Sequence, residues 1–264
     1  MKSFEFHRPQ SVEDAVGLLR GNDSAKALAG GQSLLPVMKL DLAQPSDLVS
    51  LAAIPSLREI RTEDDNLVIG ALVTHDEVAG SVEVRRRIPG LAGLAAGIGD
   101  AQVRNRGTIG GSLAHADPAA DYPAAVLALG ATIVTDRRRI AADDYFTGLF
   151  QTALAADEII TAVSFPVPER AAYAKFPSPA SKYAVVGVFV AKTAGGVRVA
   201  VTGAGSKAFR VPALESALAA SFAPDAVAEG AVPAGDLRSD GDASAEYRAH
   251  LVTVMAKRAV QACQ

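Results

Sequence analysis

Apolar residues recur along this chain at two spacings, helical in some stretches and alternating in others, and the change of spacing divides the chain into three segments. The first segment runs from residue 1 to about residue 51. Its pattern predicts, in order, a helix over 12–19 capped by Ser11, a short strand over 26–29, and a helix over 34–40 capped by Ser33.

The second segment, from about residue 52 to residue 168, mixes strands and helices and ends at two closely spaced prolines, Pro166 and Pro168. Its expected elements are hairpin strands over 57–61 and 67–70, a helix that starts at a Thr74–Glu77 capping box, helices over 91–96 and 124–129, and strands over 132–135 and 159–165.

The third segment, residues 169–264, places its strands first and its helices afterwards. The pattern predicts a strand over 172–176, a hairpin with strands over 183–191 and 197–201, and helices over 213–220 and 244–262. This order is typical of a small α+β domain. The chain shows neither a repeat of fixed period nor a low-complexity tract.

Composition and charge narrow the classes of partner. The 264 residues are 49% hydrophobic and 21% charged, a balance typical of globular proteins. With a net charge of −3 and a pI near 5.8, the chain lacks the basic field that would favour nucleic acid or an anionic membrane. The apolar run 183–191 is far too short to span a bilayer. We therefore expect no transmembrane segment and a cytoplasmic location.

Cysteine and histidine usage disfavours metal centres within this chain. Cys263 is the single cysteine, so the chain cannot supply a disulfide framework, a thiolate zinc site or an iron–sulfur cluster. The histidines are scattered without ligand spacing, at His7, His75, His115 and His250. We expect no metal site here.

Two glycine pairs precede predicted helices. Gly30-Gly31 follows the strand over 26–29, and Gly110-Gly111 lies between the hydroxyls of Thr108 and Ser112. Glycine lets a backbone approach a ligand closely, and free N–H groups at a helix start, expected here near Ser112, favour anions. Two such turns in one chain predict a dinucleotide diphosphate held between them.

The polar residues after the second turn suit other parts of a nucleotide. Asp117 and Asp121 would repel a diphosphate, so ribose hydroxyls or ring N–H groups fit them better. His115 could act as an acid or base, but a single histidine in a polar loop more often makes a structural or ligand hydrogen bond. Because no catalytic constellation stands out, the chemistry is expected to belong to a cofactor, and we name no catalytic residue.

A third glycine cluster matches the sequence fingerprint of nicotinamide-dinucleotide sites. Residues 203–208 read Gly-Ala-Gly-Ser-Lys-Ala after a strand. However, Pro212 interrupts the helix that should follow, and the preceding strand belongs to a predicted hairpin rather than a βαβ unit. Both features disfavour a nicotinamide site at residues 203–208.

The segments Ala29-Gly30-Gly31-Gln32-Ser33-Leu34-Leu35-Pro36 and Thr108-Ile109-Gly110-Gly111-Ser112, with Asp117-Pro118-Ala119-Ala120-Asp121, closely resemble the FAD-binding medium subunits of molybdenum hydroxylases, of the carbon monoxide dehydrogenase and xanthine dehydrogenase type. The likeness covers essentially the whole chain. It implies an α+β fold with a two-part, PCMH-like, non-Rossmann FAD-binding domain over 1–168, made of subdomains 1–51 and 52–168, and a smaller α+β domain over 169–264.

The resemblance also implies which residues hold FAD. The diphosphate would lie between the first motif, Ala29, Gly30, Gly31, Gln32, Ser33 and Leu34, and the second, Thr108, Ile109, Gly110, Gly111 and Ser112. His115 and Asp121 fall at FAD-binding positions, Ile159 or Ile160 at an aliphatic contact, Lys175 near the flavin, and Tyr183 over one face of the isoalloxazine.

Three positions depart from the family pattern. Ser112 stands where Asn is frequent, Lys182 stands where an acid usually precedes the aromatic residue, and Pro177-Ser178-Pro179 replaces a basic cluster. These departures concern the flavin-facing loop and the recognition of a partner or acceptor more than the diphosphate.

The function implied by the resemblance is electron transfer. A large molybdopterin-binding subunit would hydroxylate the substrate. A small [2Fe–2S] subunit would deliver electrons to FAD in this chain and on to an external acceptor. The expected assembly is a dimer of heterotrimers. Alternatives left open are a stand-alone FAD oxidase or dehydrogenase, a nicotinamide-binding dehydrogenase using residues 203–208, and a flavin-free assembly subunit.

Overall fold

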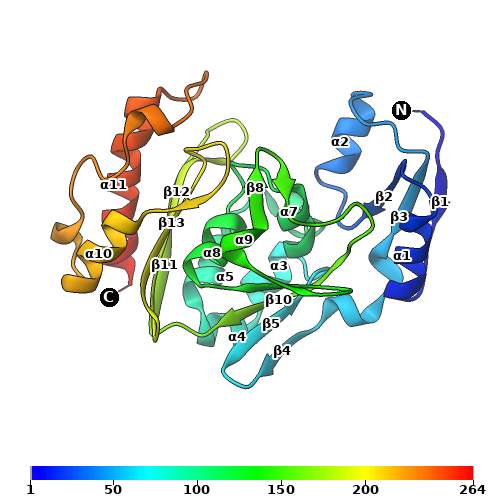
Figure 1. Cartoon of the computed structure of the whole chain (residues 1–264), viewed down its shortest axis with the longest axis horizontal. Helices are drawn as coiled ribbons and strands as arrows, with labels where there is room; N and C mark the ends of the chain where they lie inside the picture. Colours follow the sequence, from blue (N-terminus) through cyan, green and yellow to red (C-terminus); the bar gives the residue numbers. More distant parts are fainter. Residues whose placement is uncertain (1, 264) are drawn as a thin grey trace.

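In the computed structural model, which describes residues 2–263, the chain forms three units in a row (Figure 1). The N-terminal unit lies at one end, a five-stranded sheet with its helices forms the middle, and a four-stranded sheet with two helices forms the other end. Within the described residues, no helix combines the length and apolar character needed to cross a bilayer.

The N-terminal unit is a parallel three-stranded sheet in the order β1-β3-β2. Its elements are β1 (Glu5–His7), α1 (Val12–Arg20), β2 (Ala25–Leu28), α2 (Leu34–Lys39) and β3 (Asp47–Ser50). The Ser11 hydroxyl accepts a hydrogen bond from the Asp14 N–H and caps α1, as predicted. The prediction that Ser33 caps α2 is wrong, because the Ser33 side chain makes no capping bond.

The middle unit follows two 3₁₀ turns, η1 (Leu51–Ala53) and η2 (Pro55–Arg58). Its antiparallel sheet has the order β4-β5-β10-β6-β7, with Val163 opposite both Ile69 and Ile133. The elements are β4 (Ile60–Glu63), β5 (Asn66–Gly70), α3 (His75–Gly80), α4 (Val82–Arg87), α5 (Pro89–Ala96), α6 (Ala101–Arg104), α7 (Ile109–His115), α8 (Tyr122–Ala128), β6 (Thr132–Thr135), β7 (Arg139–Ala141), α9 (Ala142–Tyr145), β8 (Phe146–Gly148), β9 (Gln151–Thr152) and β10 (Ile160–Pro166).

Two predictions for this unit had opposite outcomes. The Thr74–Glu77 capping box is present in full at the start of α3. The expected strand over 57–61 is wrong in its first half, since η2 occupies it and β4 begins only at Ile60. Pro55 starts this turn, and the turn carries the Leu57 side chain into the core.

The third unit is an antiparallel sheet in strand order, β11-β12-β13-β14, followed by helices. Its elements are β11 (Arg170–Pro177), β12 (Ala184–Thr193), β13 (Gly196–Thr202), β14 (Phe209–Arg210), α10 (Pro212–Ala220), η3 (Pro224–Ala226), η4 (Ala234–Asp236) and α11 (Ala245–Ala262). The predicted order of strands before helices is confirmed.

Strand β12 is buried on both faces, which explains its unbroken apolar sequence. Successive side chains of a strand point to opposite faces. Phe189 and Ala191 therefore join the core of the middle unit, whereas Val188 and Val190 pack in the core with α10 and α11. The sheet of the third unit thus forms a wall between two cores, and a domain boundary near residue 168 stays a prediction.

Candidate cofactor-binding site

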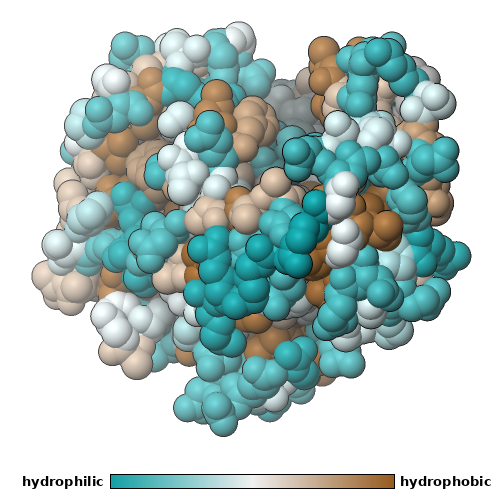
Figure 2. Space-filling model, turned by 45° about the vertical axis from the view of Figure 1, so that its right-hand side comes forward, coloured by the Kyte–Doolittle hydropathy of each residue, from teal (hydrophilic) through white to brown (hydrophobic). Residues whose placement is uncertain are grey.

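A cavity of about 710 Å³ lies where the three units meet, a size within the range of about 300–1,000 Å³ typical of small-molecule sites. Figure 2 shows the corresponding hollow between the N-terminal unit and the rest of the molecule. Its walls come from residues 26–34 of the N-terminal unit, 107–121 and 150–160 of the middle unit, and 181–183 of the third unit. The cavity is therefore built from segments distant in the sequence.

The first glycine turn presents unpaired backbone donors. Gly31 adopts a φ of +73°, a conformation that favours glycine. Leu35 N–H donates to the Gly31 carbonyl at 3.1 Å and starts α2. Among the described residues, by contrast, the N–H groups of 30–34 have no hydrogen-bond acceptor. These donors border the cavity, so the turn can bind an anion through its backbone.

The second glycine turn differs from expectation. Helix α7 begins at Ile109 rather than near Ser112, and the Thr108 hydroxyl accepts a hydrogen bond from Gly111 N–H at 3.1 Å. Ile109 N–H donates to the Val73 carbonyl at 3.1 Å, and Gly110 N–H donates to the Ala71 carbonyl at 2.9 Å. The prediction of free N–H groups at this helix start is therefore wrong.

The glycines of both turns are needed for packing within the protein. A Cβ at Gly30 would collide with the carbonyl of Arg106, and one at Gly110 would lie 2.6 Å from the Ala71 Cβ. Gly111 is different, since a Cβ there would meet the Thr108 hydroxyl at 2.8 Å and the Ala29 Cβ at 3.5 Å. Contacts at Gly30 and Gly111 thus place the two turns directly against each other.

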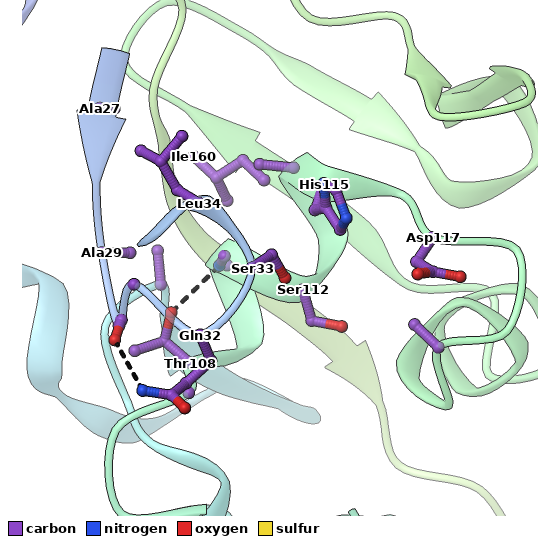
Figure 3. A pocket seen from close by; sticks show the side chains of 18 of the residues that line it. Ala27, Ala29, Gln32, Ser33, Leu34, Thr108, Ser112, His115, Asp117 and Ile160 are labelled. Carbon is purple, nitrogen blue, oxygen red and sulfur yellow. Dashed lines mark hydrogen bonds between the residues drawn. The ribbon is translucent and has the colours of Figure 1, made fainter. Parts of the chain in front are cut away.

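Polar side chains from the two turns reach the same space. Figure 3 shows Ser33 of the first turn and Ser112 of α7 pointing into the cavity, with His115 and Asp117 farther along it. Because Ser33 makes no capping bond, its hydroxyl is available to a ligand. The predicted meeting of the turns is present, and phosphate binding by them stays a prediction.

A buried ion pair adjoins the cavity through Asp121. The Lys175 ammonium is 3.1 Å from Asp121 Oδ1, and the Tyr173 hydroxyl donates to that oxygen at 2.5 Å. Burial raises the pKa of Asp121, while Lys175 and the Tyr173 hydroxyl act against this rise. Lys175 also donates to the carbonyls of Gly97 and Lys182, at 2.9 and 3.1 Å. Lys175 thus joins three segments around the cavity.

The far end of the cavity has aromatic walls. Tyr183 is partly exposed there, and burial together with the carboxylates of Asp117 and Asp121 raises the pKa of its hydroxyl. The rings of His115 and Phe150, which also line the cavity, lie 5.2 Å apart. Tyr183 therefore stays neutral at physiological pH, and this end can hold a flat aromatic group.

The predicted site residues can now be placed. Those that line the cavity are Ala29, Gly30, Gly31, Gln32, Ser33, Leu34, Thr108, Gly110, Gly111, Ser112, His115, Asp121, Ile159 and Tyr183. Lys175 reaches the site through Asp121. Ile109 is the exception, because its side chain is fully buried in the core of the middle unit and does not line the cavity.

Several lining residues were not foreseen from the sequence, among them His75 and Phe150. His75 is buried beside Gly107, its Nδ1 has no hydrogen-bond partner in the structure, and burial lowers its pKa to about 4. Phe150 lies in the tip of the β8–β9 hairpin with a φ of +53°. No local pattern marks either position, since both reach the site through the packing of remote segments.

The third glycine cluster does not form a nucleotide site of the Rossmann type. It follows β13 of an antiparallel sheet and leads into β14 rather than a helix. A Cβ at Gly203 would collide with the carbonyl of Ala184, so this glycine permits close strand packing. The structure agrees with the judgement that the nicotinamide fingerprint is fortuitous.

Comparison with known proteins places this geometry in context. Residues 2–168 match the family described as the FAD binding domain in molybdopterin dehydrogenase. The nicotine 6-hydroxylase medium subunit of Paenarthrobacter nicotinovorans is 39% identical, over 98% of this chain and 97% of that one. The carbon monoxide dehydrogenase medium chain of Hydrogenophaga pseudoflava is also 39% identical, over 98% and 96% of the two chains.

A solved structure agrees with these sequence relationships. A chain of the Hydrogenophaga pseudoflava carbon monoxide dehydrogenase, in a form lacking the Mo-pyranopterin moiety of its molybdenum cofactor, superimposes with a TM-score of 0.92. The two chains are 38% identical, and the match covers 99% of this chain and 97% of the other. The likeness thus extends through all three units.

Proposed function

The chain belongs to the FAD-binding medium subunits of molybdenum hydroxylases, and we propose that it transfers electrons from the [2Fe–2S] clusters of a small partner subunit, through FAD, to an external acceptor. The observation that carries this proposal is the meeting of the two glycine turns at one cavity, with unpaired N–H groups over 30–34 on its wall.

The residues of the cavity fit a flavin dinucleotide. The N–H groups of 30–34 and the hydroxyls of Ser33 and Ser112 would hold the diphosphate. Ile159, beyond the first turn, offers an aliphatic contact, and Tyr183 at the other end would cover an aromatic ring system. FAD bound here supplies the redox centre, and the chain positions it and shields it from water.

The rest of the electron path belongs to other subunits. An iron–sulfur cluster of this kind needs several thiolates, and this chain has only Cys263, which is buried against β12. We therefore assign the clusters to a small partner and substrate hydroxylation at molybdenum to a large partner, in a dimer of heterotrimers. Substrate choice would lie with the large partner.

Flavin analysis tests the proposal directly. The purified chain or complex should release FAD, and the complex should also contain iron, molybdenum and two further chains. Release of FMN, or absence of flavin from a folded preparation, would contradict the proposal. Turnover of a small organic substrate by the isolated chain would instead favour a stand-alone flavin enzyme.

A bulky substitution at Gly111 tests whether the glycine turns hold the flavin. Gly111→Val should abolish FAD retention, because the branched side chain would enter the contact with Thr108 and Ala29. Gly93→Val is the matched control, since Gly93 is also helical but has open space around its Cβ position. Equal FAD content in the two variants would remove the argument from the glycine turns.

A further inference from the structure

Asp121 occupies the N-cap position of α8 but does not cap this helix. An aspartate at such a position usually accepts a hydrogen bond from one of the first N–H groups of its helix. Here the Asp121 side chain makes no capping bond and is buried at the wall of the cofactor cavity. Contacts from elsewhere in the fold therefore set the direction of this carboxylate.

The backbone that leads to Asp121 is fixed by the third unit. Gly203 N–H donates to the Pro118 carbonyl at 2.7 Å, and Ala184 N–H donates to the Ala119 carbonyl at 3.2 Å. The segment before Asp121 is thus held against the ends of β12 and β13. Because the backbone is fixed, the partners of the carboxylate decide where the side chain points.

Tyr173 on β11 reaches Asp121 through a space that a glycine leaves open. The Tyr173 hydroxyl donates to Asp121 Oδ1 at 2.5 Å. The Tyr173 ring stacks on Phe189 of β12, with centroids 6.1 Å apart, and this contact orients the hydroxyl. A Cβ at Gly187 of β12 would collide with the same hydroxyl. Glycine inside a strand often marks such a close approach, so β12 is shaped to admit Tyr173.

The Asp121 carboxylate keeps one acceptor position for a ligand. Oδ1 accepts from Tyr173 and lies 3.1 Å from the Lys175 ammonium, whereas among the described residues Oδ2 accepts from Lys175 alone, at 3.2 Å. Each oxygen of an ionised carboxylate can accept two hydrogen bonds, so Oδ2 can accept a further one. Lys175 has no proton to spare, because the carbonyls of Gly97 and Lys182 accept its others.

We propose that Tyr173 is a positioning residue for FAD binding: its hydroxyl keeps the Asp121 carboxylate in the fixed, ionised form that accepts a hydrogen bond from the cofactor. The inference rests on the proposed function and adds a residue that does not itself line the cavity. Without the Tyr173 hydroxyl, Lys175 would be the only partner left to Asp121.

Loss of this hydroxyl should move the pH dependence of FAD binding. Burial raises the pKa of Asp121, and Lys175 and the Tyr173 hydroxyl act against this rise. An N–H or O–H donor of the cofactor needs the ionised carboxylate, so the affinity for FAD should fall as the pH drops through this pKa. Removal of the Tyr173 hydroxyl raises the pKa further, and the fall in affinity should come at a higher pH.

Other titratable groups near Asp121 do not produce this shift. Burial raises the pKa of the hydroxyls of Tyr122, Tyr173 and Tyr183, so all three stay neutral at physiological pH. The remaining titratable residues that line the cavity are the same in the wild type and the variants below: Lys26, His75, His115, Asp117, Glu158 and Lys182. A difference between variant and wild type therefore reports Asp121.

Equilibrium dialysis of FAD against the full chain, between about pH 4 and pH 8, tests the inference. Tyr173→Phe should bind FAD about tenfold more weakly at the acidic end, and its affinity should begin to fall about one pH unit higher. Tyr145→Phe is the matched control, because this hydroxyl bonds the Leu113 carbonyl and Tyr145 does not line the cavity. It should bind FAD like the wild type at every pH.

Two further variants make the test specific. Gly187→Ala should shift the pH dependence in the same direction, because its Cβ would displace the Tyr173 hydroxyl from Asp121. Asparagine does not titrate, so in an Asp121→Asn background the addition of Tyr173→Phe should leave the pH dependence unchanged. Circular dichroism establishes that each variant is folded.

The outcomes separate this inference from the proposed function. A folded wild-type chain that binds no FAD at any pH contradicts both. Tyr173→Phe that binds FAD like the wild type, or more weakly by the same factor at every pH, overturns the role of Tyr173 alone. The same shift in Tyr145→Phe, or one that persists in the Asp121→Asn background, overturns it as well.

Discussion

Replacing Glu158 by glutamine should destabilise the protein in a pH-dependent way. Glu158 precedes β10, and its side chain is fully buried. Its carboxylate accepts hydrogen bonds from Arg138 Nε and Nη2, each at 2.8 Å, from the Thr135 hydroxyl at 2.8 Å and from Ala155 N–H at 2.9 Å. The same segment, 154–160, forms one wall of the cofactor cavity.

The magnitude follows from the pKa of this carboxyl. Arg138 above all, with the Ala155 N–H and the Thr135 hydroxyl, outweighs burial and lowers the pKa of Glu158 from 4.5 to about 2. This difference corresponds to about 3 kcal/mol of stability at pH 7. Because the pKa is lowered on folding, the contribution is complete above pH 4.5 and is lost as the pH falls toward 2.

Urea unfolding of the wild type and Glu158→Gln at two pH values measures the effect. The variant should be less stable by about 3 kcal/mol at pH 7 and by about half as much at pH 3. Glu169→Gln is the control, because Glu169 pairs with Lys192 at the exposed surface and should change stability by less than about 1 kcal/mol. A Glu158→Gln effect that is equal at both pH values would refute the reasoning.

Three further predictions concern single positions. Gly31→Ala should destabilise the protein by about 1–2 kcal/mol, because alanine is strained at a φ of +73°. Gly17→Ala is the control: Gly17 lies in α1 with open space around its Cβ position, so this change should not lower the melting temperature. Burial lowers the pKa of His75 to about 4, so the unfolded state takes up a proton before the folded state does, and the free energy of unfolding of the wild type should fall as the pH drops from 6.5 toward 4. In urea titrations, the free energy of unfolding of His75→Gln should depend less on pH over this range. Tyr145→Phe should cost about 1 kcal/mol in chemical unfolding, since it removes the hydrogen bond from the Tyr145 hydroxyl to the Leu113 carbonyl; no change would mean that this bond is inconsequential.

Much of the secondary structure could be predicted from local patterns. The capping residues Ser11 and Thr74 mark helix starts because their side chains bond N–H groups only three residues away. The strand over 183–191 could be predicted from its unbroken apolar run, which the structure explains because burial of β12 on both faces removes the alternation. These features depend on neighbours in the sequence, and they are the ones that proved correct.

The errors arose where a remote contact outweighed a local preference. The N–H groups of Ile109 and Gly110 looked free for an anion, yet the carbonyls of Val73 and Ala71 accept them. The Ile109 side chain, within a predicted binding motif, packs in the core and does not line the cavity, and a contact of Ile109 with FAD stays a prediction. Neither contact could be read from spacing, since the partners lie more than thirty residues away.

By itself, the sequence determined that two glycine turns with hydroxyl neighbours exist, and that one cysteine cannot hold a cluster. Only the tertiary structure placed Gly30 against Arg106 and Gly111 against Ala29, and thereby formed a single cavity. It alone brought Phe150, from the β8–β9 hairpin, to the wall of this cavity. The physical reason is range: turn and helix preferences act between near neighbours, whereas a cavity is defined by side chains that only packing brings together.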